Sequence, residues 1–201
     1  SGDEKLCGIF KSGRDVHQEI AVQVFHVAPD NVDAEMRRRA KIINFGILYG
    51  MGVNALRAQL GSTTAQAHQF LEEYFTTFKT LSEYLERTKG FARTHGYTET
   101  LFGRRRQFPE MKSSLPYVRA QAERMAINAP IQGTQADIIK LAMARIDEML
   151  EREHAQKDAY LLLQVHDELV YEIRAERVSE LSKNIKGIME SVLPSEETRG
   201  V

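Results

Sequence analysis

Hydrophobic and polar positions separate most clearly between residues 34 and 50, where the chain predicts an α-helix with two distinct faces. Wound at about 100° per residue, this segment gathers an apolar stripe on one side, which consists of Met36, Ala40, Ile43, Ile47 and Met51. A second row follows strict four-residue steps on another side: Arg37, Lys41, Phe45 and Tyr49. The apolar stripe can anchor the helix on a core, while the second row passes from cationic to aromatic.

Helical spacing also dominates the rest of the first half of the chain. Asp15 can cap a helix, and Asp33 or Asn31 can cap the next one. Three further helices are predicted, two of them ended by a glycine: residues 53–60 before Gly61, residues 65–78, and residues 81–95 before Gly96. Residues 1–13, by contrast, are polar and carry no helix start of their own.

The periodicity changes at two places, and each change predicts a β-hairpin. The first hairpin begins at Tyr97, and its second strand carries Arg104, Arg105 and Arg106. The second joins the β-prone runs 161–165 and 169–173. Helical patterns fill residues 115–128, 131–152 and 175–193, and Pro130 should break or kink the long element that contains it. The predicted class is α+β, with a mostly helical part and a smaller antiparallel β part.

Composition and charge narrow the classes of function. The charged fraction of 27% and the hydrophobic fraction of 42% are those of an ordinary soluble protein. A single cysteine, Cys7, excludes an intramolecular disulfide and fits a reducing compartment. No apolar run approaches the ~20 residues that cross a bilayer, and no signal peptide is visible. The net charge of −1 argues against diffuse DNA coating, because basic residues are concentrated at 37–41 and 104–106.

The second row of the 34–50 helix suits a nucleoside triphosphate. Arg37 and Lys41 lie about 6 Å apart along the helix axis, which matches successive phosphates of one polyphosphate. Phe45, one step further, offers a flat surface to a sugar or base, and Tyr49 stands beside the flexible Gly50. The alternative is a solvated basic face followed by two core aromatic residues.

A polar row and an acidic turn add two further candidate sites. Arg124, Asn128 and Gln132 repeat the four-residue step and can all donate hydrogen bonds, as minor-groove acceptors require. A polar outer face is the alternative for that row. Asp167 and Glu168 lie at the tip of the second hairpin, where carboxylates can hold Mg²⁺ together with phosphate oxygens. Turns also favour acidic residues for local reasons.

In three stretches the sequence resembles the family A DNA polymerases. Residues 37–50 resemble the fingers helix known as motif B, and residues 164–170 resemble the palm hairpin known as motif C. Residues 126–134 resemble the palm helix that contacts the primer–template. Weaker matches at 13–17 and 100–105 fall in the order of the family, so the resemblance covers nearly the whole chain.

The resemblance implies a role for each candidate residue in template-directed nucleotidyl transfer from a dNTP to a primer 3′-OH. The dNTP-binding residues would be His17, Arg37, Lys41, Phe45 and Tyr49. The residues that contact primer–template DNA would be Tyr49, Arg124, Asn128, Gln132 and His166. The catalytic residues would be Lys41, Asp167 and Glu168. Asp167 would be a ligand for one of the two Mg²⁺ ions that the intact enzyme uses.

The resemblance also implies that part of the polymerase lies outside this sequence. Residues 1–13 resemble the palm segment after motif A, residues 14–112 the fingers, and residues 113–201 a partial palm with its catalytic hairpin at 160–173. The motif A aspartate and the thumb are missing, so the polypeptide is expected to be inactive alone. An unpaired palm edge should expose apolar surface and promote self-association. The intact enzyme is expected in the cytoplasm, associated with the nucleoid.

Two other functions compete with this interpretation. One is a metal-dependent phosphohydrolase that uses His166 and Asp167, although no other histidine is placed to complete a recognisable metal set. The other is a non-catalytic module that binds nucleic acid through residues 37–41 and 104–106. Loss of triphosphate affinity on Lys41→Ala would distinguish a polymerase fingers domain from such a module.

Overall fold

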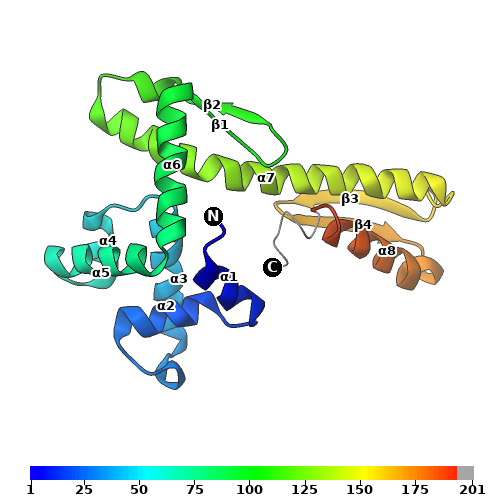
Figure 1. Cartoon of the computed structure of the whole chain (residues 1–201). Coiled ribbons are helices and arrows are strands. Elements are labelled where there is room, and N and C mark those ends of the chain that lie inside the picture. Colours follow the sequence, from blue (N-terminus) through cyan, green and yellow to red (C-terminus); the bar gives the residue numbers. More distant parts are fainter. Residues whose placement is uncertain (194–201) are drawn as a thin grey trace. The chain divides into compact units, whose positions relative to one another are not determined.

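A computed structural model describes residues 1–193 and confirms the predicted α+β class (Figure 1). The first half is helical and contains α1 (Glu4–Lys11), α2 (Val16–Phe25), α3 (Ala34–Leu48), α4 (Val53–Leu60), α5 (Thr64–Thr77) and α6 (Lys79–His95). It is followed by β1 (Tyr97–Glu99), β2 (Arg105–Gln107), α7 (Pro116–Arg152), β3 (Ala159–Val165), β4 (Glu168–Ile173) and α8 (Val178–Glu190). Short 3₁₀ turns cover Pro29–Asn31, Pro109–Lys112 and Ala175–Arg177. Within residues 1–193, no helix has the length and apolar character needed to cross a bilayer.

The described chain forms two compact units. The first comprises residues 1–98 and 105–129, and the second comprises residues 99–104 and 130–193. The limits between palm and fingers at residues 13 and 112 stay predictions, because compactness alone does not assign these functions. Residues 194–201, the end of the predicted palm segment, lie outside the described part.

Helix ends follow the capping residues in the sequence. The side chains of Asp15 and Asp33 accept hydrogen bonds from the first turns of α2 and α3, as predicted. Thr63 and Gln66 form a reciprocal capping box at the start of α5. Gly61 and Gly96 adopt the left-handed conformation that closes α4 and α6. These local signals explain why the positions of the helices could be predicted closely.

Asp3 is the helix start that the sequence analysis missed in residues 1–13. Its Oδ1 accepts a hydrogen bond from Leu6 N at 3.1 Å and so caps α1. Its Oδ2 accepts a second bond from Leu81 N at 3.3 Å, in the first turn of α6, whose own cap residue supplies no side-chain bond. Only 3% of Asp3 is exposed. The second contact spans 78 residues and could not be read from local sequence.

Replacing Asp3 with alanine should destabilise the first unit by about 2–3 kcal/mol, because one carboxylate caps two helices and is buried. The matched control is Asp33→Ala, which removes an exposed single cap and should cost about 1 kcal/mol. Urea unfolding followed by circular dichroism measures both values. Equal losses in the two variants would contradict the double cap.

Pro130 does not break the long helix, so that part of the expectation is wrong, whereas a kink at Pro130 stays a prediction. α7 continues through Pro130, which lies where the two compact units adjoin in sequence. Proline cannot donate to the carbonyl of Ala126 and costs about 3 kcal/mol in a helix interior. Burial of Ala126, Ile127 and Ala129 in the turn before it offsets that cost. The Pro130 carbonyl also accepts a hydrogen bond from Thr134 Oγ1 at 2.6 Å.

The predicted β3–β4 hairpin forms, but Glu168, which was expected in the turn between the runs 161–165 and 169–173, belongs to β4. Val165 pairs with Glu168, so His166 and Asp167 form the two-residue turn, and His166 has φ 54°. A bulge lies between Leu161 and Leu163. α7 and α8 cover one face of the hairpin through a shared core (Figure 1).

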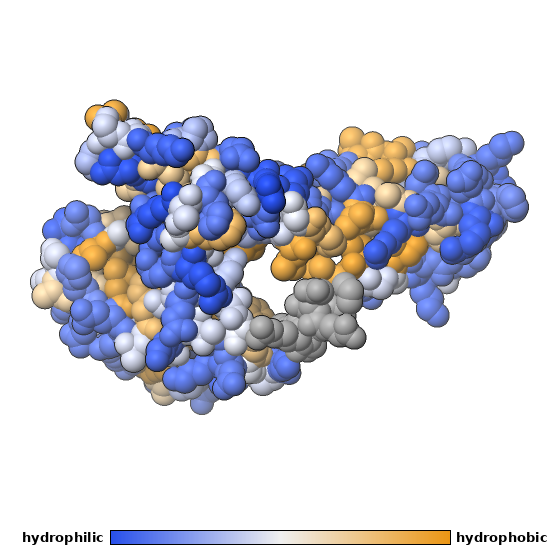
Figure 2. All heavy atoms as spheres, turned by 45° about the horizontal axis from the view of Figure 1, so that its top comes forward, coloured by the Kyte–Doolittle hydropathy of each residue, from blue (hydrophilic) through white to orange (hydrophobic). Residues whose placement is uncertain are grey.

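The rest of the hairpin exposes apolar residues. We define the exposed apolar patch by six residues of this hairpin: Tyr160, Leu161, Leu162, Leu163, Val165 and Val170. Figure 2 shows apolar side chains gathered over this part of the second unit. Within residues 1–193, neither β3 nor β4 pairs with a third strand. The predicted exposure of apolar surface is therefore confirmed.

Self-association through the exposed apolar patch should weaken at least about 5-fold when Leu163, 59% exposed, becomes lysine. A charge at the centre of the patch must be desolvated in any dimer that buries it. Leu101→Lys is the control, since Leu101 is 62% exposed but lies outside the hairpin. Sedimentation equilibrium measures the association constant, and equal effects of the two variants would refute the role of the patch.

Candidate functional site

The second row of α3 lies on its exposed side. Arg37, Lys41, Phe45 and Tyr49 are all exposed, although Phe45 and Tyr49 remain partly covered. Opposite them, Ala40, Ile43 and Ile47 are buried, as the apolar stripe predicted. Tyr49 is the C-terminal cap residue of α3, so the row runs the length of the helix from its second turn to its end. The alternative of a core position for the two aromatic residues is wrong.

α2 adds an anion and an imidazole to this row. Arg37 Nε donates to Asp15 Oδ2 at 2.6 Å, which holds the guanidinium against the start of α2. The rings of His17 and Phe45 meet edge to face, with centroids 5.2 Å apart. Phe45 and Tyr49 are nearly parallel at 6.1 Å, and Lys41 Nζ lies 5.9 Å from the Phe45 ring centre. Two cations, an imidazole and two aromatic rings therefore form one continuous surface.

Burial and charge set the protonation states on this surface. Burial lowers the pKa of His17, and the cations Arg37 and Lys41 lower it further, against the opposing charge of Asp15. Burial acts to raise the pKa of Asp15, but hydrogen bonds from Arg37 and from the backbone of α2 bring it below its usual value. His17 is therefore neutral at neutral pH, and the surface is net positive. The Nδ1 atom of His17 is buried and has no hydrogen-bond partner among the described residues.

The turn after α3 contacts α7 closely. Gly50 has φ 78°, and a Cβ at this position would lie 2.7 Å from Arg124 Cγ. Any other residue would therefore be strained and would displace the Arg124 side chain. Gly50 thus serves close packing as well as chain reversal, and it places Arg124 beside the end of the second row.

The structure assigns the polar row of α7 to both compact units. Arg124 and Asn128 belong to the first unit and Gln132 to the second. Arg124 and Gln132 are exposed, whereas Asn128 is half-buried. Asn128 Oδ1 is buried without a hydrogen-bond partner in the described part of the chain. This atom would be satisfied by a hydrogen-bond donor, and the donation of the row to minor-groove acceptors stays a prediction.

The tip of the β3–β4 hairpin presents its acidic residues to solvent. His166, Asp167 and Glu168 are all exposed, and Gln164 Nε2 donates to the His166 carbonyl at 3.2 Å. The two carboxylates are hard oxygen donors of the kind Mg²⁺ prefers, so the residues fit that ion chemically. Over residues 1–193, no three His, Cys, Asp or Glu side chains converge as a metal site.

Arg104 has a structural role that the sequence analysis did not identify. Its Nε donates to Asp137 Oδ1 at 2.6 Å, and its Nη2 donates to the Gly133 carbonyl at 3.0 Å. Burial acts to raise the pKa of Asp137, but hydrogen bonds from Thr100 and Arg104 bring it below its usual value. Arg104 therefore ties the 99–104 loop to α7 instead of belonging to a free phosphate-binding cluster.

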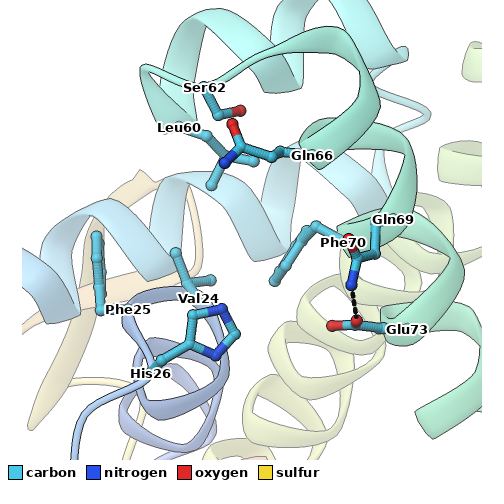
Figure 3. A pocket seen from close by; sticks show the side chains of 9 residues that line it. All are labelled: Val24, Phe25, His26, Leu60, Ser62, Gln66, Gln69, Phe70 and Glu73. Carbon is cyan, nitrogen blue, oxygen red and sulfur yellow. Dashed lines mark hydrogen bonds between the residues drawn. The ribbon is translucent and has the colours of Figure 1, made fainter.

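A cavity of about 300 Å³ lies elsewhere in the first unit, between the end of α2 and the α4–α5 pair (Figure 3). Its lining residues are Val24, Phe25, His26, Leu60, Ser62, Gln66, Gln69, Phe70 and Glu73. His26 and Phe70 point into it, and Gln69 donates to Glu73 at 2.8 Å. None of the predicted site residues lines this cavity.

Comparisons with known proteins agree with the motifs. Residues 1–197 match the model of DNA polymerase family A. The thermostable DNA polymerase I of Thermus filiformis is 46% identical over 194 residues, which are 96% of this chain and 23% of that protein. DNA polymerase I of Rhizobium leguminosarum is 42% identical over 196 residues, 97% of this chain and 19% of that protein. The chain thus spans less than a quarter of the length of these relatives.

A solved structure has the same fold. The POL domain of Pol1 from M. smegmatis, in complex with DNA primer-template and dNTP, superposes with a TM-score of 0.84 at 40% sequence identity. The match covers 93% of this chain and 33% of that one.

Proposed function

Because the chain belongs to DNA polymerase family A, we propose that it supplies the nucleotide-binding fingers and part of the palm of a template-directed DNA polymerase. The observation that carries this proposal is the exposed second row of α3, whose cations, imidazole and rings form one surface in a chain that matches the family over residues 1–197. The intact enzyme would act on primer–template DNA at the nucleoid, in the cytoplasm.

Each part of the surface has a proposed task in dNTP binding. Arg37 and Lys41 contact the triphosphate, and Lys41 donates a proton to the departing pyrophosphate. Phe45 packs on the deoxyribose, which disfavours sugars without a 3′-hydroxyl, and Tyr49 lies beside the nascent base pair. His17 approaches the phosphates from α2. Movement of α3 over a correctly paired nucleotide would complete the site, which is an induced-fit route to fidelity.

The palm residues contact metal and DNA in this proposal. Asp167 is a ligand for Mg²⁺, and Glu168 assists beside it. In the intact enzyme Asp167 would help to hold two Mg²⁺ ions, which would supply charge stabilisation for the attacking and leaving oxygens. Arg124, Asn128 and Gln132 donate to minor-groove acceptors, where the pattern is nearly independent of sequence. His166 contacts the DNA next to the metal site.

Equilibrium binding tests the proposal directly. A fluorescent dNTP should bind the chain in the presence of Mg²⁺ and a primer–template, and unlabelled dNTP should displace it. Binding of DNA without any triphosphate affinity would favour the non-catalytic nucleic-acid-binding module instead. If both ligands bind, the affinity for DNA should fall more steeply with salt than the affinity for dNTP, because DNA contacts release more counterions.

Triphosphate binding should be accompanied by proton uptake at His17. Burial and nearby cations hold the pKa of His17 below its usual value in the free chain, and an anionic ligand would raise it. Affinity for dNTP should therefore increase as the pH falls from about 8 to about 6. It should decline as the pH rises through the pKa that His17 has in the complex.

Calorimetry in two buffers of different ionisation enthalpy measures this uptake. The His17→Gln variant should lose the proton uptake that His17 contributes. The change in protonation of the dNTP itself, which opposes this uptake, should remain in the variant. Equal proton uptake in the variant and the parent chain would refute the assignment of His17.

A further inference from the structure

The core under α3 contains one buried polar contact that the apolar stripe did not predict. Asn44 lies between Ile43 and Phe45 on α3 and is 4% exposed. Its Oδ1 accepts a hydrogen bond from the Tyr74 hydroxyl of α5 at 2.6 Å. Tyr74 is 1% exposed and stands in an aromatic cluster with Phe70, Phe75 and Phe78. The bond therefore joins α3 and α5 inside the first unit, where the buried carboxylate of Asp3 also acts on Tyr74.

A hydrogen bond fixes geometry in a way that apolar contacts do not. The contacts of Ala40, Ile43 and Ile47 limit how far α3 can slide, because gaps in a close-packed core lose dispersion energy, but these contacts are not directional. The Asn44–Tyr74 bond needs its two atoms within about 0.3 Å of their present separation and in line. Rotation or sliding of α3 would leave two buried polar groups without partners, which is costly in an apolar core.

Asn44 is also placed to control the exposed side of the same helix. It directly precedes Phe45 and follows Lys41 by three residues, so all three belong to one turn of α3. Any rotation of α3 about its axis would move Lys41 and Phe45 together. A fixed contact at Asn44 therefore sets the direction in which the cation and the ring point.

We infer that Asn44 and Tyr74 are positioning residues that fix the orientation of the dNTP-binding face of α3, an inference that rests on the proposed function of that face. They touch neither nucleotide nor metal and act through the helix. Burial raises the pKa of Tyr74, so its hydroxyl stays protonated and remains a donor throughout the physiological range.

A set of variants separates positioning from stability. Tyr74→Phe and Asn44→Leu each leave one buried partner unsatisfied and should lower the melting temperature by several degrees. The double variant removes both partners, so its melting temperature should recover toward that of the parent chain. Its affinity for a fluorescent dNTP should nevertheless stay at least about 5-fold weaker, because the directional contact is gone.

Ile47→Val is the matched control on the same buried face. It should lower the melting temperature by removing one methylene from the core, yet leave the dNTP affinity within about 2-fold. Parent-like affinity in the double variant would overturn the inference. Additive losses of melting temperature in the double variant would show that the bond is not formed. Failure of the parent chain to bind dNTP at all would instead refute the proposed function. The melting temperatures of the parent, single and double variants would still report on the Asn44–Tyr74 bond.

Discussion

Replacing Lys41 with alanine should weaken dNTP binding about 10- to 100-fold while leaving the fold intact. A hydrogen bond or ion pair from a charged donor contributes about 1.5–3 kcal/mol, which corresponds to that range of affinity. Lys41 is exposed, and its Nζ lies over the edge of the surface that Phe45 forms. Nothing in the core depends on it, so circular dichroism and melting temperature should be unchanged.

Arg38→Ala provides the matched control for this experiment. It removes the same charge from the same helix, but Arg38 pairs with Glu35 at 2.6 Å and lies outside the second row. Its effect on dNTP affinity should stay below about 2-fold, since long-range effects of exposed charges are screened by salt. Fluorescence titration with a labelled dNTP gives both constants. Equal losses in the two variants would mean that α3 binds triphosphate only through net charge.

Local chemistry explains which parts of the fold could be predicted from sequence. Four capping residues contact only residues within one turn, so each indicates a helix end without knowledge of the tertiary structure. They are Asp15, Asp33, Gly61 and Gly96. The existence of the β3–β4 hairpin follows in the same way from two short β-prone runs, although its turn is one residue shorter than these runs predict. Periodicity likewise separates the buried from the exposed side of α3.

Contacts between distant residues explain what could not be predicted. Asp3 caps α6 across 78 residues, and Asn44 meets Tyr74 across 30 residues. Arg104 looked like part of a basic cluster until Asp137, 33 residues away, proved to be its partner. Asn44 lies next to Ile43 of the apolar stripe but is not part of it, so only the structure shows that this amide is buried and needs a hydrogen-bond partner.

The 201-residue polypeptide should show no detectable primer extension with Mg²⁺ and dNTPs. Its rate should lie below about 10⁻³ of the rate of a related full-length polymerase at the same molar concentration. Two-metal catalysis needs carboxylates from separate strands, whereas Asp167 and Glu168 are neighbours at one hairpin tip. The second row of α3 would therefore bind substrate without a complete centre to activate it.

The Asp167→Asn variant makes this prediction decisive. Any trace of extension that persists in the variant comes from a contaminating polymerase and leaves the prediction standing. Extension that is present in the parent polypeptide and lost in the variant would show that Asp167 suffices with the carboxylates of this chain, and the prediction would be wrong. The same preparations must still bind a fluorescent dNTP, which shows that inactivity does not come from an unfolded α3.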